Sequence, residues 1–356
     1  MKYFVRFLPL LFFVGTSVSA LAAAGGDSKG KFYGAMKTEY PSWFKESFLD
    51  FNEDIADASK AGKRLMVLFT QDGCPYCNAL VERNLAQKDI EQAVRKNFDV
   101  VAMNMWGDRE VVSVGRKNYT EKSFAAALKV QFTPTILFFN EKGKVILRLN
   151  GYLPPDRFKI ALDYVTNKKE NTLSYREYVA KNLPGTSSGK LNREDFFMVE
   201  PYDLTRKPGS KKPFAIFFEQ KDCPNCDTLH NRVLIDEETR NIVRQFDVVQ
   251  LDMWSDTKIK LHDGKSTTAR ELAKKLDVKY APTLVIFNPA GKEVIRSEAF
   301  FKVFHTQGIF HYVLSGSYKT EPSFQRYLSE RAKQFQQQGK DVDIWRLGDE
   351  PGAGGG

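Results

Sequence analysis

Short apolar runs alternate along the first half of the chain with segments whose apolar residues fall at helical spacing. The apolar runs predict buried strands over residues 65–70, 98–103, 135–139 and 145–149. The helical spacing predicts a helix that opens at residues 74–77 and further helices over residues 89–96, 124–128 and 156–166. Strands that alternate with helices, followed by a hairpin and a closing helix, predict an α/β domain with a mixed central sheet flanked by helices.

The same order of elements recurs in the second half. Strands are predicted over residues 214–218, 246–253, 284–287 and 294–296, and helices over residues 223–233, 268–276 and 307–314. The stretches at 98–101 and 105–108 recur at 246–249 and 253–256, in both cases 148 positions later. A period this long, with matching stretches in the same order, indicates a duplicated domain rather than a solenoid.

The segments outside the two copies complete the predicted domain organisation. We expect a first domain over 25–167, a joint over 168–192, a second domain over 193–316, a helical extension over 317–347 and a disordered tail over 348–356. The joint contains residues 184–189, whose Pro, Gly and Ser are typical of a flexible linker. Ahead of the first strand, apolar residues between 43 and 55 predict an amphipathic helix that packs on the first domain.

The first 24 residues have the pattern of a cleaved secretory signal. Lys2 and Arg6 form a basic start, residues 7–14 are continuously apolar, and small residues at 20–24 supply cleavage sites. An uncleaved membrane anchor is the alternative, although the apolar run is near the lower length limit for a spanning helix. We therefore expect an exported, periplasmic protein.

The net charge argues against a nucleic-acid partner. Lys and Arg number 53 and Asp and Glu number 44, which gives +9 over 356 residues. The positive residues are scattered, with no run of five or six. A nucleic-acid-binding protein would gather them in a patch or stripe.

All four cysteines lie in two C-x-x-C pairs, Cys74 with Cys77 and Cys223 with Cys226. A disulfide that closes so small a ring adds little stability, so the pairs are predicted to serve chemistry. A thiol at a helix N-terminus is deprotonated more readily because unpaired N–H groups and the helix dipole favour the thiolate. We therefore expect Cys74 and Cys223 to attack a disulfide, and Cys77 and Cys226 to resolve the mixed disulfide.

Metal binding is the competing use of a cysteine pair. Cys223, Cys226 and His230 fall at i, i+3 and i+7, so two thiolates and an imidazole could bind Cu or Zn. The first copy has Val81 where the second has His230, which disfavours a shared metal function. We expect His230 to be exposed on its helix, and we predict no metal site and no cofactor.

A proline directly precedes an apolar strand in each copy, in Thr133-Pro134 and in Ala281-Pro282. With the C-x-x-C pairs, this pattern resembles the thioredoxin superfamily. The resemblance implies two tandem thioredoxin-like domains in which a cis-proline loop faces each cysteine pair. It further implies that Thr133, Pro134, Ala281 and Pro282 contact the substrate, with Thr133 and Ala281 touching the sulfurs. The spacing from cysteine to proline exceeds the minimal fold and fits an insertion at residues 106–119 and 254–265.

The sequence departs from typical thioredoxins around the cysteines. Gly73 and Asp222 stand where thioredoxins usually carry Trp, and Leu68 and Phe217 stand where they bury an acid. Glu219 could replace that acid in the second copy, but we expect it to be exposed. Activity therefore need not match that of thioredoxin.

The function that these features predict is thiol–disulfide exchange with other proteins. Similarity to SoxW-type periplasmic thioredoxins, which are associated with sulfur-oxidation operons, is carried by residues 73–77, 103–108 and 132–135. We expect a disulfide reductase that acts on protein disulfides and receives electrons from a membrane thiol donor, with isomerase or oxidase action as the alternative. The hypothesis requires that a partner can reach sulfurs lying beside Pro134 and Pro282.

Overall fold

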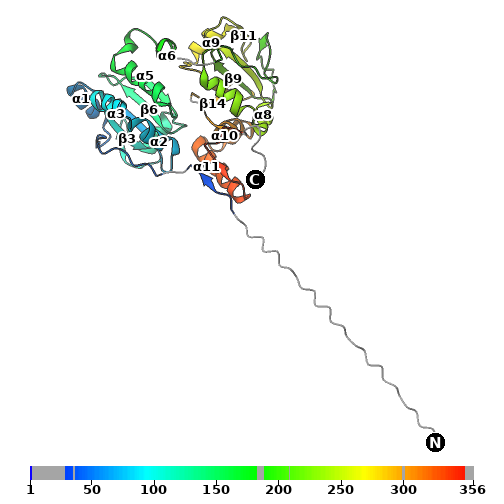
Figure 1. Cartoon of the computed structure of the whole chain (residues 1–356), viewed down its shortest axis with the longest axis horizontal. Coiled ribbons are helices and arrows are strands. Elements are labelled where there is room, and N and C mark those ends of the chain that lie inside the picture. The colour runs from blue at the N-terminus through cyan, green and yellow to red at the C-terminus, as the bar shows by residue number, and fades with distance from the viewer. Residues whose placement is uncertain (2–28, 35–36, 183–187, 208, 299–300, 349–356) are drawn as a thin grey trace.

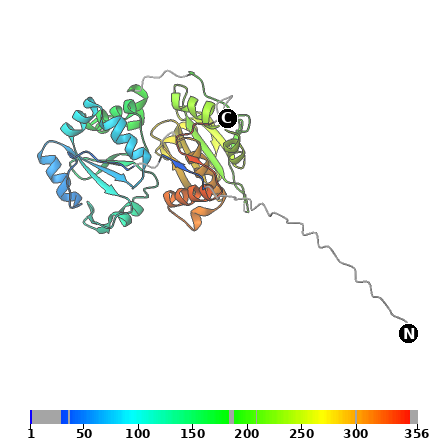
Figure 2. The same cartoon turned by 60° about the horizontal axis from the view of Figure 1, so that its bottom comes forward.

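Two similar α/β halves lie side by side in the computed structural model, in both views of Figures 1 and 2. The structure describes Met1 and residues 29–34, 37–182, 188–207, 209–298 and 301–348. We call residues 37–182 the first half and residues 188–348 the second half. The predicted signal, part of the joint and most of the predicted tail lie outside the described residues.

The sheet of the first half has the strand order β3-β2-β6-β7. Strands β2 and β3 run parallel, whereas β6 is antiparallel to both of its neighbours. The bounds are β2 Arg64–Thr70, β3 Phe98–Asn104, β6 Thr135–Phe139 and β7 Val145–Asn150. All four predicted strands of this copy are therefore present, in a mixed sheet.

Helices cover both faces of this sheet because successive strand residues point to opposite sides. Met66 and Leu68 pack with helices on one face, and Val67 and Phe69 pack with helices on the other. The helices of the first half are α1 Phe51–Lys60, α2 Pro75–Ala79, the π-helix η1 Leu80–Leu85, α3 Lys88–Asn97, α4 Glu121–Ala127, α5 Pro155–Thr166, the 3₁₀-helix η2 Lys169–Asn171 and α6 Tyr175–Asn182.

The second half repeats this plan with the strand order β10-β9-β13-β14. The strands are β9 Phe214–Glu219, β10 Asp247–Asp252, β13 Thr283–Phe287 and β14 Glu293–Ser297. The helices are α7 Pro224–Thr228, the π-helix η3 Leu229–Val233, α8 Glu237–Val243, α9 Ala269–Lys275, α10 Val303–Leu314, the 3₁₀-helix η4 Ser317–Lys319 and α11 Phe324–Gln337. The duplication read from the sequence is thus a duplication of the fold.

Short strands lie in and directly after the predicted insertions. In the first copy, β4 Glu110–Val112 pairs with β5 Asn118–Thr120, and in the second, β11 Lys258–Lys260 pairs with β12 Ser266–Thr268. The second hairpin also pairs with β8 Tyr202–Asp203. Among the described residues 188–207 and 209–213 no helix precedes β9 as α1 precedes β2, and Met198, Tyr202 and Leu204 pack on that face of the second sheet instead.

Two expectations about the flanking segments were wrong in part. The helix predicted between 43 and 55 begins only at Phe51, because the Asp50 side chain caps it by accepting from the backbone N–H groups of Asn52 and Glu53. Phe48, one of the apolar residues within the predicted helix, is fully exposed. Within the predicted joint over 168–192, residues 169–171 and 175–182 are helical.

The two ends of the described chain meet. Strand β1 Phe32–Tyr33 runs parallel to β15 Val342–Asp343, beside α11 in Figure 1. The N-terminal arm is therefore bound to the extension that follows the second copy. Among the described residues, no helix combines the length and the apolar character needed to cross a membrane.

Candidate functional site

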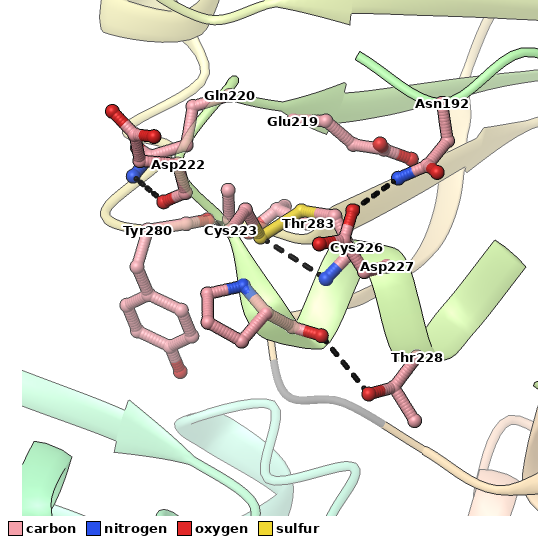
Figure 3. The surroundings of a disulfide bond; sticks show 12 residues. Asn192, Glu219, Gln220, Asp222, Cys223, Cys226, Asp227, Thr228, Tyr280 and Thr283 are labelled. Atoms are coloured by element: carbon pink, nitrogen blue, oxygen red, sulfur yellow. Dashed lines mark hydrogen bonds between the residues drawn. A yellow bond between two sulfur atoms is a disulfide. The ribbon is translucent and has the colours of Figure 1, made fainter. Parts of the chain in front are cut away.

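Each cysteine pair lies where a strand passes into a helix. Cys74 and Cys223 are the capping residues of α2 and α7, and each Sγ accepts a hydrogen bond from the N–H of the second cysteine of its pair at 3.1 Å. Both pairs are disulfide-bonded, as Figure 3 shows for the second. The N–H that now points at sulfur would stabilise a thiolate after reduction.

The loops predicted to face the cysteines carry cis peptide bonds, Thr133–Pro134 and Ala281–Pro282. In the first copy, the Thr133 hydroxyl lies 3.3 Å from Cys74 Sγ, and the Thr133 carbonyl oxygen lies 3.6 Å from the same atom. In the second copy, Ala281 shares one apolar cluster with both cysteines but has no hydroxyl to offer. The structure therefore brings each cysteine pair together with its own proline loop.

A tryptophan–glutamine hydrogen bond fixes the loop ahead of each cysteine pair. Trp106 Nε1 donates to Gln71 Oε1, and Trp254 Nε1 donates to Gln220 Oε1, both at 3.0 Å. The glutamine precedes the first cysteine by three residues in each copy. Sequence reasoning missed this pairing, although the recurrence of both partners at matching positions signals it.

The second site contains a buried acid, so the expectation that Glu219 is exposed was wrong. Glu219 is fully buried, and its carboxylate lies 2.8 Å from His230 Nε2 and accepts from Gln250 at 2.9 Å. The alternation of β9 gives the signal that was missed, because Glu219 follows the inward-facing Phe217 by two positions. Figure 3 shows Glu219 among the residues around the second disulfide.

The expectation that His230 is exposed was also wrong. The residue is 3% exposed, and its Nδ1 lies 2.8 Å from Glu194 Oε1 while its Nε2 faces Glu219. Burial alone would lower the His230 pKa, but the hydrogen bonds to Glu194 and Glu219 outweigh burial and raise it to about 9. Both ring nitrogens then donate to carboxylates at neutral pH.

The contacts of His230 argue against the alternative prediction that Cys223, Cys226 and His230 bind a metal ion. A metal-binding imidazole needs a free ring nitrogen, and both nitrogens of His230 face carboxylate oxygens. Across the ranges that the structure describes, no three His, Cys, Asp or Glu side chains are grouped so as to hold an ion. The donor set of Cys223, Cys226 and His230 therefore does not fit a metal centre in this arrangement.

All four cysteine side chains are buried in this arrangement. The exposed fraction is 2% for Cys74, 0% for Cys77 and 1% for each of Cys223 and Cys226. Both cysteines of the first pair cluster with apolar residues of the second half rather than with their own core. The second half therefore contributes to the apolar surroundings of the first pair.

Comparison with known proteins gives one family and a set of similar folds. The model of the thioredoxin-like domain matches residues 51–166 and 201–303. No curated protein matches the sequence. The SoxW-type likeness stays a prediction, because no comparison names that subfamily.

Several solved structures are similar to part of this chain. A thioredoxin-fold protein from Helicobacter pylori is 23% identical with a TM-score of 0.31, over 38% of this chain and 90% of that one. A thioredoxin from Thermus thermophilus is 21% identical with a TM-score of 0.27, over 38% and 87%. A disulphide isomerase from Xylella fastidiosa is 17% identical with a TM-score of 0.24, over 40% and 94%.

Proposed function

We propose, from the premise that the chain belongs to the thioredoxin-like family over its two matched segments, that it is a thiol–disulfide oxidoreductase with two redox sites. One observation carries the proposal: two cysteine pairs, each disulfide-bonded at a helix start, with Sγ receiving an N–H and a cis-proline loop beside it. A structural staple would join distant segments, which neither pair does.

The reaction follows from the positions of the two sulfurs. In the reduced protein the Cys74 thiolate attacks one sulfur of a substrate disulfide and expels the other as a thiolate, which leaves a mixed disulfide. The Cys77 thiolate then attacks Cys74 Sγ and releases the second substrate thiol. The substrate gains two electrons, and the protein is left in the oxidised form that the structure shows. Cys223 and Cys226 would act in the same way.

The direction, compartment and partner are the finer parts of the proposal. We propose that the protein works in the periplasm as a reductase of protein disulfides, and that a membrane thiol donor restores its cysteines. The basic, apolar and small-residue pattern of residues 1–24 supports export. Donor and substrate would both use the sulfur of Cys74 or Cys223, the first cysteine of each pair.

A redox titration of the purified mature chain tests the proposal. Equilibration with glutathione and dithiothreitol buffers should give one two-electron transition in Cys74→Ser and one in Cys223→Ser, each from the remaining pair. Reduced wild-type protein should also cleave a model protein disulfide. A chain whose cysteines do not change oxidation state across the range would refute the function, and a potential near −120 mV would favour an oxidase over a reductase.

A further inference from the structure

The duplicated unit includes one helix more than the cysteine domain itself. Helix α5 is followed by η2 and α6, and α10 is followed 148 residues later by η4 and α11. Each of these trailing helices packs on the closing helix of its own half and also carries side chains that contact the other half. We call α6 and α11 the cover helices.

Helix α11 covers the redox face of the first copy. The ring of Phe132, beside the cis-proline loop, lies 5.4 Å from the ring of Phe324. The Phe324 N–H donates to the Gln131 side-chain oxygen at 3.1 Å, and the Gln325 amide donates to the Gln131 carbonyl at 3.0 Å. The Arg326 guanidinium lies 4.8 Å over the ring of Trp106.

Tyr76, the second of the two residues between Cys74 and Cys77, is also in contact with the second half. The ring of Tyr76 lies 5.3 Å from His305 and 4.9 Å from Trp345, in edge contacts. Phe301 stacks at 5.0 Å on Phe132. Burial raises the pKa of the Tyr76 phenol and lowers the pKa of His305 to about 4. This face is therefore dry and apolar while the halves are in contact.

Residues of the first half contact the second copy at its cis-proline loop and at Trp254, although Cys223 and Cys226 cluster with residues of their own half. Arg157 on α5 donates to the carbonyl of Ala281, the residue before the cis-proline, at 3.1 Å. Tyr280 is buried in the apolar cluster of the first half, which includes Tyr175, and Figure 3 shows it pointing from the second copy toward the ribbon of the first half. Arg176 on α6 lies 4.0 Å over the ring of Trp254, as Arg326 lies over Trp106.

The two closures belong to one contact between the halves. Asn150 and Glu298 occupy equivalent positions, 148 residues apart, and the Asn150 side chain donates to the Glu298 carboxylate. Contact between equivalent residues is the mark of a two-fold interface, here within a single chain. A single movement of one half away from the other would therefore uncover both sites.

The covered groups are those that an extended polypeptide would use. A strand that docks beside a cis-proline loop pairs with its backbone carbonyls, and here the carbonyls of Gln131 and Ala281 are taken by side-chain donors. Aromatic rings of the chain fill the adjoining space around Tyr76 and Phe132. The occupant that this surface fits is thus a polypeptide with aromatic side chains.

We propose that each redox face is a binding surface for an extended polypeptide with aromatic side chains beside its disulfide, and that the chain blocks both faces reciprocally with its cover helices. That the polypeptide is a disulfide substrate rests on the proposed function. That the cover helices block the two faces is independent of the proposed function. The closed form is a resting state, and a partner gains both sites when it displaces the helices.

Alkylation of the reduced full-length chain tests the blocking without any turnover. Rates of reaction of Cys74 and Cys223 with iodoacetamide are measured by peptide mass spectrometry. One variant weakens the cover of the first site, Gln325→Ala with Arg326→Ala, and another weakens that of the second, Arg157→Ala with Arg176→Ala. The matched control is Glu330→Ala with Lys333→Ala, an exposed ion pair on α11.

Each cover variant should accelerate alkylation at both sites by about tenfold, which corresponds to about 1.4 kcal/mol, while the control keeps the wild-type rates. Rates that stay at the wild-type value in both cover variants, or that rise only at the nearer site, would overturn the reciprocal closure. Near-ultraviolet circular dichroism confirms that each variant is folded. A chain without disulfide-exchange activity would still give these rates, so the two proposals fail separately.

The proposed preference for aromatic side chains is tested in the variant whose first site is uncovered. A cysteine-free peptide with two Phe residues should slow alkylation of Cys74 in the Gln325→Ala, Arg326→Ala chain. The same peptide with Ser in place of Phe should have no effect. Equal protection by both peptides, or by neither, would contradict an aromatic preference.

Discussion

The two sites keep the same sulfurs but differ in the residues that supply and accept protons. Thr133 offers a hydroxyl to Cys74, whereas Ala281 offers none to Cys223. The second site has a buried carboxylate at Glu219, where the equivalent residue of the first copy is Thr70. The cysteines and prolines could be located from the sequence because their spacing is local. The two carboxylate partners of His230 could not, because Glu194 and Glu219 are 25 positions apart in the sequence.

The hydroxyl of Thr133 should lower the pKa of Cys74 once the disulfide is reduced. A hydrogen bond to a charged group contributes about 1.5–3 kcal/mol, and one pKa unit corresponds to about 1.4 kcal/mol. Thr133→Ala should therefore raise the Cys74 pKa by about one unit, and Ala281→Thr should lower that of Cys223. The measurement is thiolate absorbance at 240 nm against pH, in chains that retain one cysteine pair. An unchanged titration curve in Thr133→Ala would show that the hydroxyl does not act on the sulfur.

His230 should make stability depend on pH above neutrality. Its pKa in the folded chain, about 9, exceeds the ordinary value of 6.5, so its stabilisation is complete below pH 6.5 and is lost as the pH rises through 9. The free energy of unfolding in urea should fall by about 3 kcal/mol more in wild type than in His230→Gln between pH 6 and pH 10. Parallel pH profiles for the two proteins would exclude a protonated His230 between Glu194 and Glu219.

At the scale of elements, the sequence predicts well the strands whose apolar residues pack within a single core. All eight predicted strands exist because continuous apolar runs fit a sheet covered on both faces. The start of α1 was misplaced because aromatic residues at 43 and 44 pack on the core without being helical, so spacing alone misled. The cover helix α6 was missed because residues 168–192 were assigned to a joint between the copies and no helix was predicted there.

The capping side chain of Asp50 sets the start of α1 and should be measurable as stability. Asp50→Ala leaves the Asn52 and Glu53 N–H groups without their acceptor and should lower the free energy of unfolding by about 1 kcal/mol. Asp50→Asn should retain most of this stabilisation, because an Asn side chain also accepts hydrogen bonds at the start of a helix. Glu53→Gln, exposed in the same turn, should cost only about 0.3 kcal/mol. Urea unfolding at pH 7 compares the three variants with the wild type. Equal stability of Asp50→Ala and wild type would show that the Asp50 cap does not stabilise α1.

At the scale of the whole molecule, packing between the halves decides what the sites can do. Phe132 and Tyr280 each stand just ahead of a strand in the sequence. Each is nevertheless buried in an apolar cluster formed mainly by residues of the opposite half. No local pattern distinguishes an aromatic residue that fills its own core from one that fills its neighbour's. The domain count could therefore be predicted, whereas the reciprocal closure required the structure.

This shared packing should make the halves unfold together. Unfolding either half exposes apolar surface on the other, so calorimetry of the wild type should show one transition whose calorimetric and van't Hoff enthalpies agree. Phe132→Ala removes ring contacts with Phe301 and Phe324 and should split the transition in two. Phe98→Ala, within the first core, should lower the temperature of a single transition without splitting it. Two separate transitions in the wild type would show that the interface contributes too little to couple the halves, and the cover helices could then not hold the sites closed.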